Sequence, residues 1–104
     1  MIYRLEVTPR AREDLDSLAT WISRDNLDAA DRLLDKVAEV VQTLVRFPRL
    51  GARRFHRGRS HLELRRIPVL SFPDILVVYE VSEQTECVTI HRVLHGRRDL
   101  DALL

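Results

Sequence analysis

The chain has 104 residues, a length that fits one domain with a single modest core, covering residues 1–104. Its composition, 45% hydrophobic and 32% charged, excludes a disordered chain, and the single cysteine, Cys87, excludes an internal disulfide framework. The most apolar span, residues 67–81, is interrupted by proline and charge and is too short for a membrane helix. With no visible signal peptide, these features predict a cytoplasmic protein with no membrane partner.

A net charge of +1 conceals a strong segregation of charge along the chain. Residues 1–45 carry nine acids and six bases, whereas residues 46–66 carry eight arginines against one acid, Glu63. Such a basic segment suits phosphates or an acidic protein partner. It is equally compatible with a solvated loop and an edge strand that charge protects from pairing.

The first half of the chain predicts one strand and two helices. Residues 2–7 alternate as in a half-buried strand. Thr8 and Pro9 then have the residue types of a helix N-cap and first turn, and residues 25–26 separate this helix from a second one, which Phe47-Pro48 ends. The expected inward stripes are Ala11, Leu15, Leu18, Ala19 and Ile22, then Ala30, Leu33, Leu34, Val37, Val41 and Leu44.

The second half changes to the period of a strand. Residues 61–65 alternate, residues 75–79 are continuously apolar as in a central strand, and residues 87–94 form a last strand after the turn at 82–85. A further short strand near Phe55 has a poor signal. The fold class is therefore α+β: an N-terminal strand and a helical hairpin on a small antiparallel sheet, in the order β-α-α-β-β-β with one optional extra strand.

Motifs for cofactors and metals are missing from the sequence. The three glycines lie well apart, no cysteine pair is present, and the four histidines lack the spacing of a zinc ligand set. We therefore expect neither a cofactor nor a metal.

One candidate for chemistry is the set of Glu63, Arg65 and His91. On the expected strands, Glu63 and Arg65 share a face, and His91 shares a face with Val93, opposite Arg92. If the three side chains met on the uncovered sheet face, they could deprotonate a ribose hydroxyl and stabilise a phosphate transition state. A row of cross-strand ion pairs explains the same residues without catalysis.

A second candidate is the charged cluster that follows the last strand: His95, Arg97, Arg98 and Asp99. Gly96 allows the chain to turn out of the sheet there. The cluster either presents a recognition surface or holds Asp99 in an ion pair that pins the tail. The residues alone leave both readings open.

The sequence resembles the ParE branch of the RelE/ParE toxins of type II toxin–antitoxin modules, also called plasmid stabilisation proteins. The matching runs are Tyr3-Arg4-Leu5, Ala11-Arg12-Glu13-Asp14-Leu15, Trp21-Ile22, Leu44 to Gly51, Leu76-Val77-Val78-Tyr79 and, most specifically, Arg92-Val93-Leu94-His95-Gly96-Arg97-Arg98-Asp99-Leu100.

The resemblance implies the same α+β architecture and two kinds of partner. A cognate antitoxin would wrap and neutralise the toxin, with Arg53, Arg54, Arg57, Arg59 and Arg65 as expected contacts. ParE members bind and poison DNA gyrase, for which His95, Arg97, Arg98 and Asp99 are the expected contacts and no catalytic residue is needed.

The RelE branch instead cleaves mRNA on the ribosome, which would require Glu63, Arg65 and His91 here. Its members often carry an aromatic residue near the carboxy terminus. The tail after Gly96 contains none, a departure that favours the gyrase-binding reading.

Overall fold

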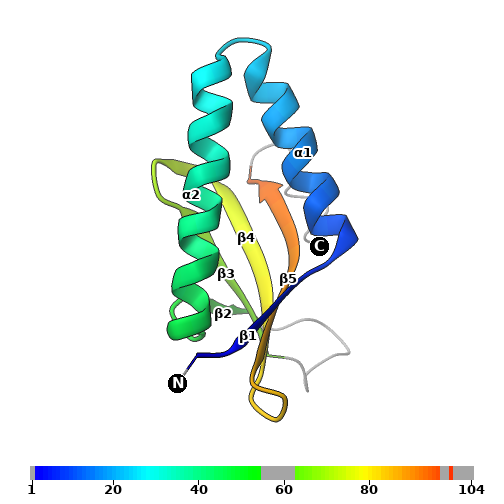
Figure 1. Ribbon diagram of the computed structural model, residues 1–104, viewed down its shortest axis with the longest axis vertical. Helices are drawn as coiled ribbons and strands as arrows, with labels where there is room; N and C mark the ends of the chain where they lie inside the picture. Colours follow the sequence, from blue (N-terminus) through cyan, green and yellow to red (C-terminus); the bar gives the residue numbers. More distant parts are fainter. Residues whose placement is uncertain (1, 55–62, 97–98, 100–104) are drawn as a thin grey trace.

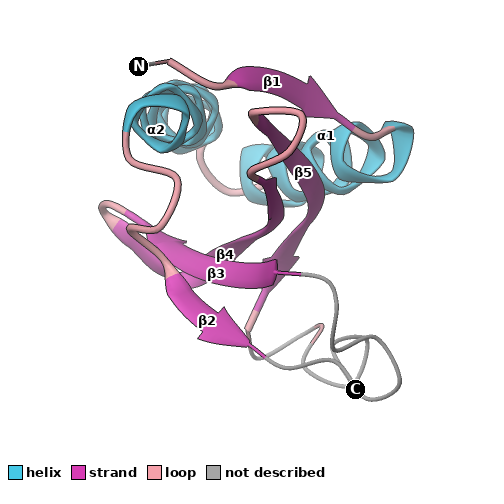
Figure 2. Ribbon diagram, turned by 90° about the horizontal axis from the view of Figure 1, so that it is seen from below, coloured by secondary structure: helices cyan, strands magenta, loops and turns pink. Residues whose placement is uncertain are grey.

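The computed structural model describes residues 2–54, 63–96 and 99 as two helices packed on a five-stranded sheet (Figure 1). The elements are β1 (Arg4–Val7), α1 (Pro9–Ser23), α2 (Leu27–Arg46), β2 (Ala52–Arg54), β3 (Glu63–Val69), β4 (Phe72–Ser82) and β5 (Cys87–His95). Seen from below, both helices lie on the same side of strands β2, β3 and β4, and β1 lies beyond them (Figure 2). The predicted α+β class is confirmed.

Both helices begin where the sequence places them, because both have side-chain caps. The hydroxyl of Thr8 accepts a hydrogen bond from the backbone N–H of Ala11 at 3.1 Å, and Pro9 occupies the first turn. The side chain of Asn26 caps α2 by accepting from the N–H of Ala29 at 3.0 Å. These caps fix the start of each helix and the short turn between them.

The sheet has the strand order β1-β5-β4-β3-β2 and is mixed rather than purely antiparallel. Strands β2 to β5 pair antiparallel, as predicted, but β1 pairs parallel to β5. Parallel neighbours need a long connection, and here almost the whole chain lies between the two strands. The optional strand is β2, which precedes Phe55; Phe55 itself lies outside the described residues.

The core lies between the helices and one face of the sheet. It includes Leu18 of α1, Leu33 and Leu44 of α2, and Val77 and Ile90 of the sheet, all nearly inaccessible to solvent. The predicted stripe of α2 is wrong at Leu34, which is exposed because the helix turns that position away from the sheet. Within the described residues, neither helix has the length and apolar character needed to cross a membrane.

Candidate functional site

Glu63, Arg65 and His91 are not brought together by the fold. Glu63 and Arg65 lie opposite Val81 and Tyr79 of β4, whose side chains are buried beneath the helices. His91 instead lies 3.2 Å from the carboxylate of Glu80, measured from its Nε2 to Oε1. Because Glu80 alternates with Tyr79 and Val81, this pair lies on the sheet face turned away from the helices, hereafter the far face.

A β-bulge in β5 explains the failed expectation for His91. Ile90 lies opposite Tyr79 and Arg92 lies opposite Val78, so His91 is an extra residue in the ladder. Past the bulge the alternation is shifted, and Val93 joins the core beneath the helices. His91 and Val93 therefore lie on opposite faces, contrary to the alternation read from the sequence.

Glu63 and Arg65 belong to an ion-pair network with Arg49. The Nε atoms of Arg65 and Arg49 lie 3.0 and 3.2 Å from Oε2 of Glu63. Burial raises the pKa of Glu63, but the hydrogen bond from Arg65 and the charge of Arg49 outweigh it, so the pKa lies below its ordinary value. A carboxylate held ionised in this way is a weak general base.

Arg65 also holds the turn that follows α2. Its Nη1 donates to the carbonyl oxygen of Gly51 at 2.7 Å and to that of Arg49 at 3.3 Å, and its side chain is only 14% exposed. Little of Arg65 is left for an antitoxin. Of the other arginines expected to contact the antitoxin, Arg53 is exposed, the structure describes only the backbone of Arg54, and Arg57 and Arg59 lie outside the described residues.

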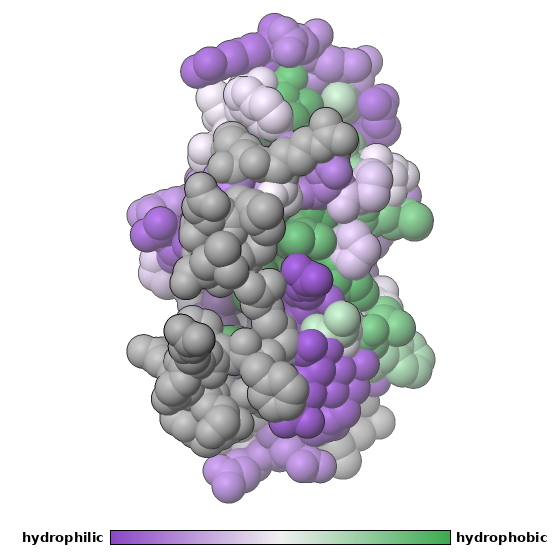
Figure 3. All heavy atoms as spheres, turned by 180° about the vertical axis from the view of Figure 1, so that it is seen from behind, coloured by the Kyte–Doolittle hydropathy of each residue, from purple (hydrophilic) through white to green (hydrophobic). Residues whose placement is uncertain are grey.

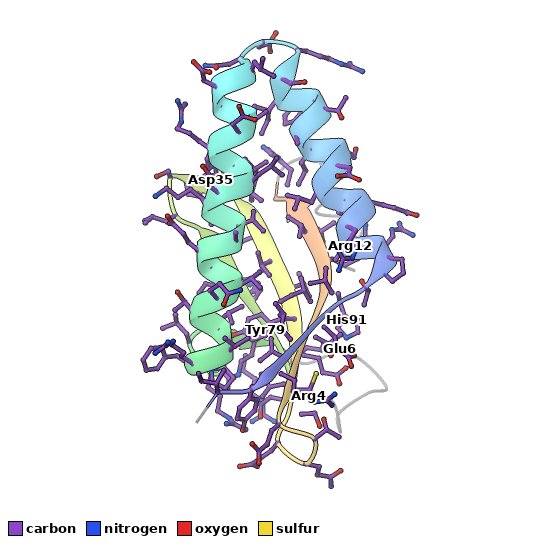
Figure 4. All side chains as sticks on the ribbon, viewed as in Figure 1. Arg4, Glu6, Arg12, Asp35, Tyr79 and His91 are labelled. Atoms are coloured by element: carbon purple, nitrogen blue, oxygen red, sulfur yellow. The ribbon has the colours of Figure 1, made fainter. Side chains whose placement is uncertain are left out.

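The buried hydroxyl of Tyr79 completes this turn. It donates to the carbonyl oxygen of Pro48 at 2.8 Å and accepts from the N–H of Gly51 at 2.9 Å. A Cβ at Gly51 would approach that hydroxyl to 2.7 Å, so only glycine fits. Figure 4 labels Tyr79 on the sheet beside the lower half of α2. Sequence reasoning missed this role, because it treated the tyrosine as one more apolar residue of a central strand.

The end of β5 is held by three hydrogen bonds and one contact between aromatic rings. The N–H of His95 donates to the carboxylate of Asp99 at 2.9 Å, and the N–H of Asp99 donates back to the carbonyl of His95 at 2.7 Å. The N–H of Gly96 donates to the carbonyl of Asp74 on β4 at 2.5 Å. The ring of His95 meets the ring of Trp21 edge-on, with centroids 5.3 Å apart. Of the predicted target contacts, His95 and Asp99 are thus neighbours, while Arg97 and Arg98 lie outside the described residues.

Asp14 of α1 covers the outer edge of β5 at Arg92 and Val93. Its carboxylate accepts from Nε and Nη2 of Arg92 at 2.7 and 3.1 Å and from the N–H of Val93 at 3.0 Å. The hydrogen bond that Arg92 donates to Asp14 raises the pKa of Arg92, so this guanidinium stays charged. Sequence reasoning missed this contact, since nothing in the chain links residues 78 positions apart.

An apolar groove lies between α2 and the β3–β4 hairpin. It encloses about 620 Å³ and is lined mainly by apolar side chains: Val40, Leu50, Ile67, Pro68, Val69, Leu70 and Pro73, with Glu39, Thr43 and Ser71. Leu70 is 68% exposed at its rim. Viewed from behind, hydrophobic side chains gather along one side of the molecule (Figure 3). Such a surface is typical of a site that another chain covers.

The described parts of the chain contain no group of three side chains able to hold a metal ion.

Residues 5–100 match the family model of the ParE toxin of type II toxin–antitoxin systems, parDE. The chain belongs to the ParE toxin family. It is accordingly a toxin of a type II toxin–antitoxin system.

A curated relative supports the ParE assignment. The protein named "Putative toxin Y4kP" from Sinorhizobium fredii is 31% identical over 87 residues, which span 84% of each chain. The resemblance on which the sequence was assigned to the ParE branch is therefore confirmed.

Solved structures of ParE and RelE proteins share the fold of this ParE-family chain. A chain from the chromosomal ParDE system of Pseudomonas aeruginosa matches with a TM-score of 0.69 at 18% identity, covering 90% of this chain and 96% of that one. A chain of the RelBE2 toxin–antitoxin complex from Mycobacterium tuberculosis matches with a TM-score of 0.64 at 23% identity, covering 91% and 99%. The isolated RelE toxin of Escherichia coli matches at 0.53 and 16%, covering 98% and 99%. Because ParE and RelE proteins both match, the fold alone does not choose between their activities.

Proposed function

We propose that this ParE-family toxin acts by binding DNA gyrase and that a cognate antitoxin neutralises it. The observation that carries the proposal is the separation of Glu63 and Arg65 from His91 by the sheet. These three residues do not form an acid–base set. A toxin that binds gyrase needs none, because gyrase itself cuts the DNA.

The end of β5 supports recognition as the mode of action. His95 and Asp99 are tied to one another, to β4 and to α1, so the start of the predicted target surface is ordered before any partner arrives. A surface ordered in advance loses less conformational entropy on binding. We assign His95 to target contact together with Arg97 and Arg98, and Asp99 to holding the backbone of His95.

The apolar groove supports the proposal that an antitoxin binds this toxin. We propose that a segment of the cognate antitoxin covers Val40, Leu50 and Leu70 and places acidic residues near Arg49, in the turn after α2, and near Arg53 of β2. Burial of apolar area would supply most of the affinity, and the arginines would set the orientation.

A supercoiling assay with purified toxin tests the gyrase proposal. The toxin at micromolar concentration should inhibit supercoiling and increase cleaved DNA, and added antitoxin should reverse both effects. His95→Ala should weaken inhibition, whereas Leu27→Gln, on an exposed leucine at the start of α2, should not. Gyrase that is unaffected by wild-type toxin would reject the proposal.

One observation keeps mRNA cleavage on the ribosome as a second candidate. His91 and Glu80 form an acid–base pair on the far face, where an RNA could reach them without displacing the helices. This candidate predicts new transcript ends after induction that disappear in His91→Ala. Intact transcripts in a culture that is being killed would dismiss it.

A further inference from the structure

Trp21 is the chain's one tryptophan, and it is 43% exposed. It lies on α1, a helix whose inward side is already filled by Leu18, which is fully buried, and by Ile22, which packs against the core. The core therefore does not explain a large aromatic side chain at this outward position. Tryptophan is enriched among the residues that dominate protein–protein binding energy.

The ring of Trp21 is fixed against the end of β5. It meets the ring of His95 at an interplanar angle of 86°, with centroids 5.3 Å apart. An edge-to-face contact of this kind is a preferred aromatic geometry, so the orientation of both rings is set before a partner binds. A protein that contacts His95 consequently finds Trp21 beside it.

Two hollows of different chemistry flank Trp21. One, of about 360 Å³, has a polar lining that includes Asp16, Thr20 and Arg24 of α1. The other, of about 320 Å³, lies toward the β3–β4 turn and has Phe72 and Ile75 among its lining residues. A partly exposed aromatic ring that borders two hollows can contact side chains of a partner protein on both of its sides.

The geometry points to Trp21 as the central anchor of the surface that binds the toxin's protein target. The target would place an apolar side chain in the hollow at Phe72 and Ile75 and a polar or charged side chain in the hollow at Asp16 and Arg24. This inference rests on the proposed function, because it takes the target to be gyrase, and it extends the contact surface from β5 onto α1.

The position of the hollows favours the target over the antitoxin as the occupant. The hollow at Phe72 includes His95 in its lining and is therefore continuous with the proposed target surface. Ser71 of the β3–β4 turn and Pro73 at the start of β4 line both this hollow and the apolar groove proposed for the antitoxin, so the turn separates the two. Each surface therefore has its own side of the turn.

Binding measurements with purified gyrase test the anchor through two variants of different kinds. Trp21→Ala removes the ring, and Thr20→Arg leaves it in place but fills the polar hollow beside it. Gln42→Arg is the matched control, because it adds the same charge at an exposed position of α2 that lines none of the three surface hollows. We expect both test variants to weaken gyrase affinity about tenfold or more, with the control unchanged.

Two further readouts separate a binding role from a folding role. Thermal unfolding and antitoxin affinity of Thr20→Arg should match those of the control. A photo-activated cross-linking residue at position 20 should capture gyrase, whereas the same residue at position 42 should not.

The possible failures are distinguishable. If wild-type toxin binds gyrase and both variants bind equally well, the anchor is overturned while the proposed function stands. If the variants weaken antitoxin binding and spare gyrase, the surface belongs to the antitoxin and the inference is wrong. If wild-type toxin does not bind gyrase at all, the proposed function and the inference fall together.

Discussion

At the scale of single residues, the hydroxyl of Tyr79 has a role that its apolar surroundings hide. It is a buried polar group whose two hydrogen bonds both go to the turn between α2 and β2. Burial raises the pKa of Tyr79, so the group stays protonated and continues to donate to Pro48. The hydroxyl therefore fixes the position of the turn that carries Arg49.

Removing that hydroxyl tests its contribution. Tyr79→Phe keeps the ring but leaves the N–H of Gly51 and the carbonyl of Pro48 without their partner. We expect a loss of about 1–3 kcal/mol in the free energy of unfolding, measured by urea denaturation. Ser17→Ala removes an exposed hydroxyl and should change stability by less than about 0.5 kcal/mol. Equal effects of the two changes would contradict a special role for Tyr79.

The lowered pKa of Glu63 predicts a dependence of stability on pH. The folded state favours the ionised form, so Glu63 contributes stability above the ordinary pKa of 4.5 and loses it as pH falls through the lower folded value. Glu63→Gln should therefore be less stable than wild type at neutral pH, with the difference shrinking below about pH 4.5. A constant difference down to pH 3 in denaturation curves would refute the ion-pair account.

At the scale of elements, β5 depends on α1 to complete its outer edge. Strand β1 pairs only with residues 87–90 of β5. Beyond that point the hydroxyl of Thr8 donates to the carbonyl of His91 at 3.1 Å, and the carboxylate of Asp14 accepts from Val93. Beyond the end of β1, α1 and its N-cap therefore satisfy backbone groups on the outer edge of β5. These bonds hold the strand that carries His95.

Breaking this helix–strand contact should cost stability. Asp14→Ala leaves the partly buried guanidinium of Arg92 and the N–H of Val93 without their acceptor, and we expect a loss of about 1–3 kcal/mol in the free energy of unfolding. Arg10 is the control, because it also lies near Asp14, at 3.9 Å, but its side chain is 65% exposed. Arg10→Ala should cost no more than about 0.5 kcal/mol. Thermal unfolding of Asp14→Ala, Arg92→Ala and the double variant would show whether the energy belongs to the Asp14–Arg92 pair.

The features of elements that could be predicted are those encoded locally. The N-caps at Thr8 and Asn26 and the inward Leu18 and Leu33 follow from short patterns, and the structure has them. The parallel pairing of β1 and the Asp14–Arg92 contact join distant parts of the chain, which periodicity does not report. The bulge at His91 was missed because one extra residue in a ladder has no signature here and reverses every later side chain.

At the scale of the whole molecule, the β3–β4 turn divides two surfaces. On one side lies the apolar groove against α2, and on the other lies the hollow that Trp21 and His95 border. Arg49, which precedes Leu50 of the groove lining, adjoins the first surface, and the end of β5 adjoins the second. If the two proposed partners bind at these places, the antitoxin and the target occupy separate surfaces, and a segment seated in the groove must extend past the turn to block the second surface.

The groove can be tested without changing the charge of the molecule. Leu70→Gln and Leu50→Gln each remove an exposed apolar side chain from its lining. The control is Leu27→Gln at the start of α2, where the leucine is 67% exposed, compared with 68% for Leu70. If the antitoxin covers the groove, the first two changes should weaken its binding about tenfold, since each buried leucine contributes roughly 1.5–3 kcal/mol. Gyrase inhibition by the same variants should stay at the wild-type level, because the groove lies across the turn from Trp21.

In cells, co-expressed antitoxin should then fail to restore growth against Leu70→Gln and succeed against Leu27→Gln. Equal rescue of both variants would show that the antitoxin lies elsewhere on the molecule, and loss of gyrase inhibition in Leu70→Gln would show that the two surfaces are one.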